Sequence, residues 1–150
     1  VLKKTRREVI DMIHAWAALE SMAARLATLH ASDEAIADLR KLFQSFNEGH
    51  KPADHLSEYS TANIQFHPSS VNLSASQVLV YSADQVRVHG RGVRRITIGR
   101  DDRASRSIID HLAIIDAIEQ RDTERAVKLS RDHTLNLAEY VEANSQGIFE

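Results

Sequence analysis

Polar residues of the kinds that bind metal ions interrupt three apolar stripes in this sequence. His111 and His133 each lie in a run of apolar residues spaced three or four positions apart, which is the spacing of one helix face. Asn63 lies in a third such run, and His67 follows four residues later, so their side chains can share a face. Buried imidazoles and amides need partners, and a shared divalent metal ion would supply one for all of them. For each histidine alone, a hydrogen bond to a backbone carbonyl is the alternative.

A basic run lies on the fourth of the expected helices. It comprises Arg87, Arg91, Arg94 and Arg95, and His89 lies within it. A solvated helix face is the ordinary reason for such a run. Arg87 and Arg94 are seven residues apart and share one flank beside an apolar stripe, where an arginine could bind a carboxylate through two hydrogen bonds. His89 could line the same cavity or cap the core, and we take Arg87 and His89 as candidate effector-binding residues.

The composition excludes several classes of protein. The 150 residues contain no cysteine, so disulfide frameworks and thiolate metal sites are excluded and any metal must use histidine, carboxylate or amide ligands. The formal net charge of -2 argues against a surface that grips nucleic acid. No run approaches the roughly 20 apolar residues of a membrane span, and the charged start does not resemble a signal peptide, so we expect a cytoplasmic protein with no membrane partner. A start at Val1 just before a basic cluster suggests part of a longer chain.

Apolar periodicity and capping signals predict helices throughout. A capping box at Thr5 and Glu8 begins the first helix, and Ser32 precedes a second that is expected to continue through Phe46 and end at Gly49. The third is expected to begin at 52–54. The apolar stripes cover residues 9–26, 39–46, 56–66, 79–93, 108–118 and 126–140. One all-α domain over residues 1–150 is therefore expected, an antiparallel bundle of six to seven helices with Trp16, Leu19, Leu79, Ile115 and Leu129 buried.

Two segments depart from this regular pattern. Pro68 should kink or break the third helix, because proline lacks the backbone donor and clashes with the carbonyl four residues earlier. It also pushes the preceding residue, His67, away from helical geometry. Residues 71–82 are rich in serine and valine, which lowers their helix propensity.

Common enzyme motifs are missing from the sequence. There is neither a glycine-rich phosphate loop nor a Gly-x-Ser-x-Gly elbow. No aspartate or glutamate lies in the three stripes that carry the candidate ligands, so no general base is available beside a metal. We therefore expect a protein that is not an enzyme.

The order of motifs resembles a known family. The motifs are Leu19-Glu20 with an alanine-rich continuation, Asn63-x-x-Phe66-His67, Asp110-His111-x-x-Ile114-Ile115-Asp116-Ala117-Ile118, Arg121-Asp122 and Asp132-His133. Together they resemble the C-terminal effector-binding domain, called FCD, of GntR-family transcription regulators of the FadR subfamily. The resemblance covers about residues 5 to 143.

The resemblance implies a metal-dependent sensor. Asn63, His67, His111 and His133 would hold a divalent ion such as Zn²⁺, Ni²⁺ or Mn²⁺, and a small organic acid would complete its coordination. The chain departs from the family where Asn63 replaces the usual aspartate and where a proline follows His67. An N-terminal winged-helix domain, absent from this chain, would bind DNA, and the protein would form a homodimer.

The sequence therefore favours the ligand-sensing domain of a transcription regulator. Binding of an effector at the metal would control DNA binding by the missing winged-helix domain. A metal-free effector domain is the first alternative, and it would follow if the proline disables the site. A metal-dependent enzyme on a helical bundle is the second.

Overall fold

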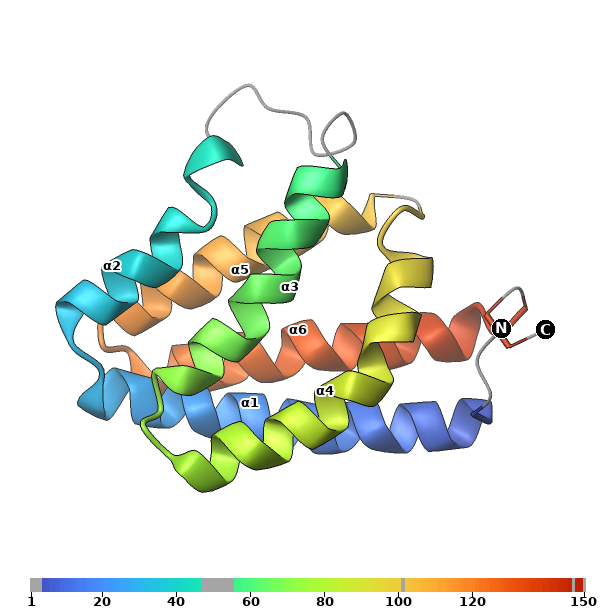
Figure 1. Cartoon of the computed structure of the whole chain (residues 1–150), viewed down its shortest axis with the longest axis horizontal. Helices are drawn as coiled ribbons and strands as arrows, with labels where there is room; N and C mark the ends of the chain where they lie inside the picture. Colours follow the sequence, from blue (N-terminus) through green and yellow to red (C-terminus); the bar gives the residue numbers. More distant parts are fainter. Residues whose placement is uncertain (1–3, 47–55, 101, 147, 150) are drawn as a thin grey trace.

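The computed structural model describes residues 4–46, 56–100, 102–146 and 148–149 and shows an antiparallel bundle of helices (Figure 1). The helices are α1 (Arg6–His30), α2 (Asp33–Lys41), the 3-10 helix η1 (Gln44–Phe46), α3 (Leu56–Asn72), α4 (Gln77–Thr97), α5 (Arg103–Glu119) and α6 (Thr123–Ala143). Within the described residues there is no strand, so the predicted all-α class is confirmed. No described helix is long and apolar enough to cross a membrane.

Helices α1 and α6 form the base of the bundle. They run side by side in opposite directions, and α4 crosses over them while α3 and α5 pack above (Figure 1). The capping box predicted at the start of α1 is present, because the Thr5 hydroxyl and the Glu8 carboxylate each accept a backbone amide hydrogen of the other residue. Of the five side chains predicted to be buried, Trp16 and Ile115 are buried. The other three, Leu19, Leu79 and Leu129, are only partly buried.

A glycine lets α4 approach α1 closely. A Cβ atom at Gly90 would lie 2.7 Å from Cζ3 of Trp16, which is closer than two carbon atoms can pack. The absence of a side chain at this position brings α4 against the indole. The indole in turn contacts two polar groups of the protein interior, because its ring centroid lies 5.4 Å from that of His67 and 4.2 Å from Cζ of Arg94.

The predicted break at Pro68 does not occur. Helix α3 continues through this residue to Asn72, and the amide of Leu73 still donates to the carbonyl of Ser69 at 3.3 Å. Proline removes only its own donor, and near the end of a helix few later turns depend on it. The residues after α3 form a tight turn in which Ala75 has a φ of 53°, and the Ser76 side chain caps α4.

The second predicted helix is shorter than expected. Helix α2 ends at Lys41, and a 3-10 turn replaces the rest of the predicted stripe up to Phe46. Phe43, in the turn between α2 and the 3-10 helix, is still buried in the core. The predicted end at Gly49 and the predicted start of the third helix at 52–54 lie outside the described residues.

Candidate metal centre

Three of the four predicted metal ligands meet inside the bundle. His67 comes from α3, His111 from α5 and His133 from α6, and one ring nitrogen of each lies within 4.8 Å of the others. His111 and His133 are equally distant in sequence from Asp122, at the turn between two antiparallel helices, so they lie at the same level of that hairpin. The side chains are almost completely enclosed, with His111 fully buried and His67 exposed by 3%.

Two carboxylates fix the orientation of two of the rings. Nδ1 of His67 lies 2.7 Å from Oε1 of Glu20, and Nδ1 of His133 lies 3.0 Å from Oδ2 of Asp110. A carboxylate accepts hydrogen bonds, so each Nδ1 carries the proton and each Nε2 keeps its lone pair. The second oxygen of Glu20 accepts a hydrogen bond from the Thr134 hydroxyl at 2.8 Å. Such carboxylate–histidine pairs commonly orient metal-binding imidazoles.

Burial favours the neutral form of His67 and His111. Desolvation lowers the pKa of His67 and His111 well below the usual range, and the positive charge of Arg94 lowers both further. Desolvation raises the pKa of Glu20, while Arg94 acts in the opposite direction. Neutral imidazole is the form that binds a metal, so the environment supplies ligands that need no deprotonation at pH 7.

The Nε2 atoms point toward the centre of this group. Nε2 of His111 lies 3.0 Å from Nε2 of His133. Nε2 of His67 accepts a hydrogen bond from Nη1 of Arg94, 2.5 Å away. The guanidinium therefore occupies the position next to His67 that an incoming ion would take, and it would have to move aside for the ion to bind.

Asn63, the fourth predicted ligand, lies one helical turn before His67 on α3. Its side chain is 4% exposed, and its Oδ1 has no hydrogen-bond partner among the described residues. Both Asn63 and His67 line a cavity of about 430 Å³ between α3 and α4. An unpartnered buried carbonyl oxygen costs about 1–3 kcal/mol, which a cation would offset. Three imidazole nitrogens and an amide oxygen fit a borderline divalent ion such as Zn²⁺, Ni²⁺ or Mn²⁺.

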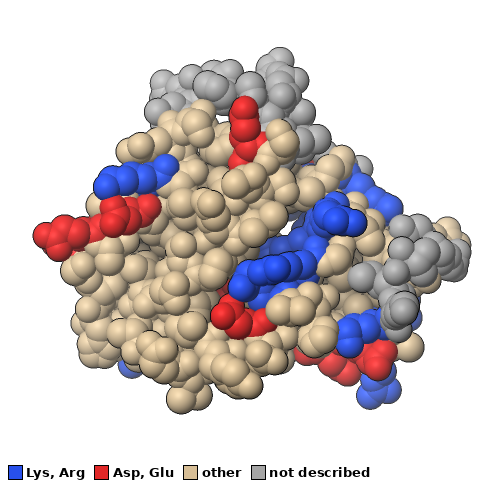
Figure 2. Space-filling model, viewed as in Figure 1, with Lys and Arg blue, Asp and Glu red and all other residues tan. Residues whose placement is uncertain are grey.

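The two predicted effector-binding residues lie in different surroundings. Arg87 lines the cavity between α3 and α4 and pairs with Asp84 at 2.7 Å. His89 is exposed and lines none of the described cavities. Basic side chains gather along α4 beside a hollow on this face (Figure 2).

Two residues at the centre were not among the predicted site residues. Glu20 is a buried acid within the apolar stripe of α1. An acidic residue in such a stripe is the feature of the sequence that could have indicated a role inside the bundle. Arg94 lies seven residues after Arg87 on the same flank of α4, and it is the one that reaches a histidine. The sequence places both arginines on one flank of the helix. Which of them contacts His67 depends on how α3 packs against α4.

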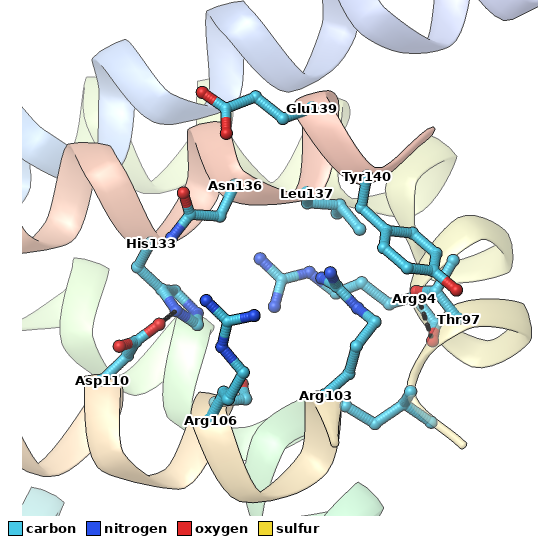
Figure 3. A pocket seen from close by; sticks show the side chains of 12 residues that line it. Arg94, Thr97, Arg103, Arg106, Asp110, His133, Asn136, Leu137, Glu139 and Tyr140 are labelled. Carbon is cyan, nitrogen blue, oxygen red and sulfur yellow. Dashed lines mark hydrogen bonds and ion pairs between the residues drawn. The ribbon is translucent and has the colours of Figure 1, made fainter. Parts of the chain in front are cut away.

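A second cavity opens on the other side of Arg94. It has a volume of about 220 Å³ and lies between the end of α4, the first turns of α5 and the middle of α6 (Figure 3). His133 and Arg94 both line it, so it is continuous with the three-histidine group. The centre is thus reached from two sides.

The structure is that of an all-α bundle with a buried histidine centre, and comparisons place it in a family. Residues 11–136 match the FCD domain family, and the chain belongs to that family, as the resemblance in the sequence predicted. The fold is similar to that of E. coli McbR/YncC, with a TM-score of 0.76 over 95% of this chain and 68% of that chain. The two sequences are 15% identical, so this similarity concerns the fold. A comparison with curated protein sequences found no match.

Proposed function

We propose that this domain is the ligand-sensing part of a GntR-type transcription regulator and that it binds a divalent metal ion through Asn63, His67, His111 and His133. The observation that carries the proposal is the convergence of three imidazoles, two of them buried and the third half-buried, with ring nitrogens within 4.8 Å of one another. Two of them are held by carboxylates in the tautomer that leaves a lone pair on Nε2. Membership of the FCD family supports the role of a sensor.

A small organic acid would be the effector. Four protein ligands leave two positions on an octahedral ion, and a bound metal would supply a Lewis acid for a carboxylate. Arg94 would leave His67 when the ion binds, and its guanidinium could then pair with the carboxylate of the effector. Both cavities beside the centre give the acid a route to that position.

Changes at the centre can reach α1 directly. Glu20 lies on α1 and bonds both to His67 of α3 and to Thr134 of α6. A shift of His67 or of Thr134 would therefore move the helix that leads toward the N-terminal side of the domain. Under the proposal a winged-helix domain on that side binds DNA, and effector binding changes its affinity. A homodimer belongs to the same proposal and can be measured by sedimentation.

The metal-free alternative also has a specific observation in its favour. Arg94 already occupies the position next to His67, and a carboxylate could bind this guanidinium without a metal. Catalysis is less well supported, because the two carboxylates at the centre, Glu20 and Asp110, are each engaged with a histidine. Among the described residues of the site, no carboxylate therefore remains free to act as a general base.

A thermal-shift screen distinguishes these functions. The chelator-treated protein is melted alone, with Zn²⁺, Ni²⁺ or Mn²⁺, and with small organic acids in the presence and absence of each metal. The proposal predicts that the metal raises Tm and that acids raise it further only when the metal is present, because a ligand that binds the native state stabilises it. Equal stabilisation by acids without metal would favour the metal-free alternative. Consumption of an acid by the metal-loaded protein would instead indicate an enzyme.

A further inference from the structure

The cavity between α4, α5 and α6 gathers three arginines around its opening. Arg94, Arg103 and Arg106 all line it, and their guanidinium groups point into the same space (Figure 3). Arg103 and Arg106 are three residues apart on α5, which places them on one face of that helix. The carboxylates in the lining are Asp110, which accepts a hydrogen bond from His133, and the exposed Glu139. The cavity therefore carries an excess of positive charge.

Aromatic rings position two of these arginines. Cζ of Arg94 lies 4.2 Å from the centroid of Trp16, and Cζ of Arg103 lies 4.3 Å from that of Tyr140. Stacking on a ring holds the plane of a guanidinium in a fixed orientation. For Arg94, Nε and Nη2 are buried and have no hydrogen-bond partner among the described residues. Buried donors of this kind need an acceptor.

The start of α5 adds to the attraction for anions. Arg103, Arg106 and Ser107 belong to the first two turns of this helix, where the partial positive charge of its N-terminus lies. The hydroxyl of Ser107 and the amide of Asn136 also line the cavity and can donate hydrogen bonds. The volume of about 220 Å³ is below the range of roughly 300–1,000 Å³ that is typical of ligand pockets, so it suits a small acid and not a long acyl chain.

We propose that this cavity is an oxyanion site and that the effector is a small acid with two anionic groups. This inference rests on the proposed function: one carboxylate binds the metal held by the histidines, and the second oxyanion, a carboxylate or a phosphate, binds Arg94, Arg103 and Arg106. His133 and Arg94 belong both to the metal centre and to the cavity, so one small molecule can contact both. The cavity on the Asn63 side is also lined by Arg87, Arg91 and Arg95, of which Arg87 is paired with Asp84.

Calorimetric titration of the metal-loaded chain with three acids tests this site. Propionate has one carboxylate, succinate has two, and phosphoglycolate has a carboxylate and a phosphate. We expect one of the two acids with two anionic groups to bind at least about tenfold more tightly than propionate, as one additional charge-assisted hydrogen-bonded pair would provide. Preference for succinate identifies the second group as a carboxylate, and preference for phosphoglycolate identifies it as a phosphate.

Two variants locate the preference in the cavity. Arg106→Gln should reduce the ratio of dianion to propionate affinity about tenfold, because it removes one cation from the site. Arg125→Gln, on the exposed part of α6 outside the cavity, should leave the ratio within about twofold of wild type. Titration with the metal alone checks that both variants keep an intact centre.

Each contrary result has a distinct meaning. If propionate binds the metal-loaded protein as tightly as both dianions do, the oxyanion site is wrong while the proposed function stands. The same conclusion follows if Arg106→Gln leaves the preference unchanged or if both variants reduce it equally. If no acid binds although the metal does, both the effector proposal and the oxyanion site are wrong.

Discussion

Nδ1 of His133 lies 3.0 Å from Oδ2 of Asp110, so the residue directly before one candidate ligand orients another. His111 points its own ring at His133 from the same helix, with the two Nε2 atoms 3.0 Å apart. The Asp110-His111 dipeptide therefore contributes one candidate ligand, His111, and the carboxylate that orients another, His133. The second Asp-His pair of the centre is different, because Asp132 pairs with Lys128 at 2.6 Å and not with a histidine.

Asp110→Ala should weaken metal binding about 10- to 100-fold, since removal of a supporting carboxylate frees the ring of His133 and its tautomer. Competition with a chromogenic chelator measures the affinity. Asp132→Ala is the matched control, because it also removes an aspartate that precedes a histidine, and it should leave the affinity within about twofold. Equal losses in the two variants would contradict the assigned role of Asp110.

Asn63→Asp should have opposite effects with and without metal. The carboxylate of the variant attracts the ion by its negative charge. An additional attraction of about 1.4 kcal/mol would raise the metal affinity about tenfold. Without metal the same buried carboxylate lacks a partner and should lower the free energy of unfolding. Urea unfolding with and without Ni²⁺ measures both effects. A variant that is equally destabilised in both conditions would place Asn63 outside the metal site.

Gly90→Ala should lower the free energy of unfolding by about 1–3 kcal/mol, because the new methyl group meets the buried indole of Trp16 at 2.7 Å. This loss exceeds the small gain in helix propensity that alanine brings. Gly99→Ala is the control, since nothing lies within 4 Å of a Cβ there, and it should be close to neutral. Thermal unfolding of the two variants compares them, and a stabilised Gly90→Ala protein would show that α4 does not pack as described.

Acid should destabilise the metal-free protein through the buried histidines. The pKa values of His67 and His111 are lowered in the folded state, so below the unfolded value near 6.5 the unfolded chain binds more protons. The stability is complete above that pH and falls as the pH decreases, by about 1.4 kcal/mol per pH unit for each group. Glu20 contributes in the opposite direction. Because its pKa is raised in the folded state, its contribution to stability is lost as the pH rises from 4.5.

His111→Leu isolates one of these groups. It removes a fully buried imidazole whose Nδ1 has no partner in the described structure, so the decline in stability between pH 6.5 and 5 should be about half as steep as in wild type. Chemical unfolding at several pH values measures the slope. His14→Gln, at an exposed position of α1, should keep the wild-type slope. An unchanged slope in His111→Leu would mean that this imidazole takes up a proton in the folded state.

Much of the centre could be predicted from the sequence because its parts are local. A ligand within an apolar helix stripe must point inward, and the positions of His111 and His133 about the turn at Asp122 place them at one level. The overall all-α class followed from the same periodicity. Arg94 and Glu20 could not be assigned in this way, because their contacts with His67 depend on how α1 and α4 pack against α3.

The errors have local physical causes as well. Of the kink or break predicted at Pro68, the break does not occur, because this residue lies within the last turns of α3, where a single lost donor is tolerated. The second helix was extended through Phe46 because a 3-10 turn preserves an apolar stripe over a few residues. Neither error moved a candidate ligand out of the centre, since His67 remains on the inner face of α3.

The metal content of the purified chain tests the central claim most directly. Wild-type protein, His133→Ala, and the exposed-site control His14→Ala are each incubated with Zn²⁺ or Ni²⁺, passed through a desalting column and analysed by mass spectrometry for metal per chain. We predict one ion per chain in wild type and in His14→Ala and almost none in His133→Ala. Absence of metal from the wild-type protein, or equal retention in all three, would contradict the account.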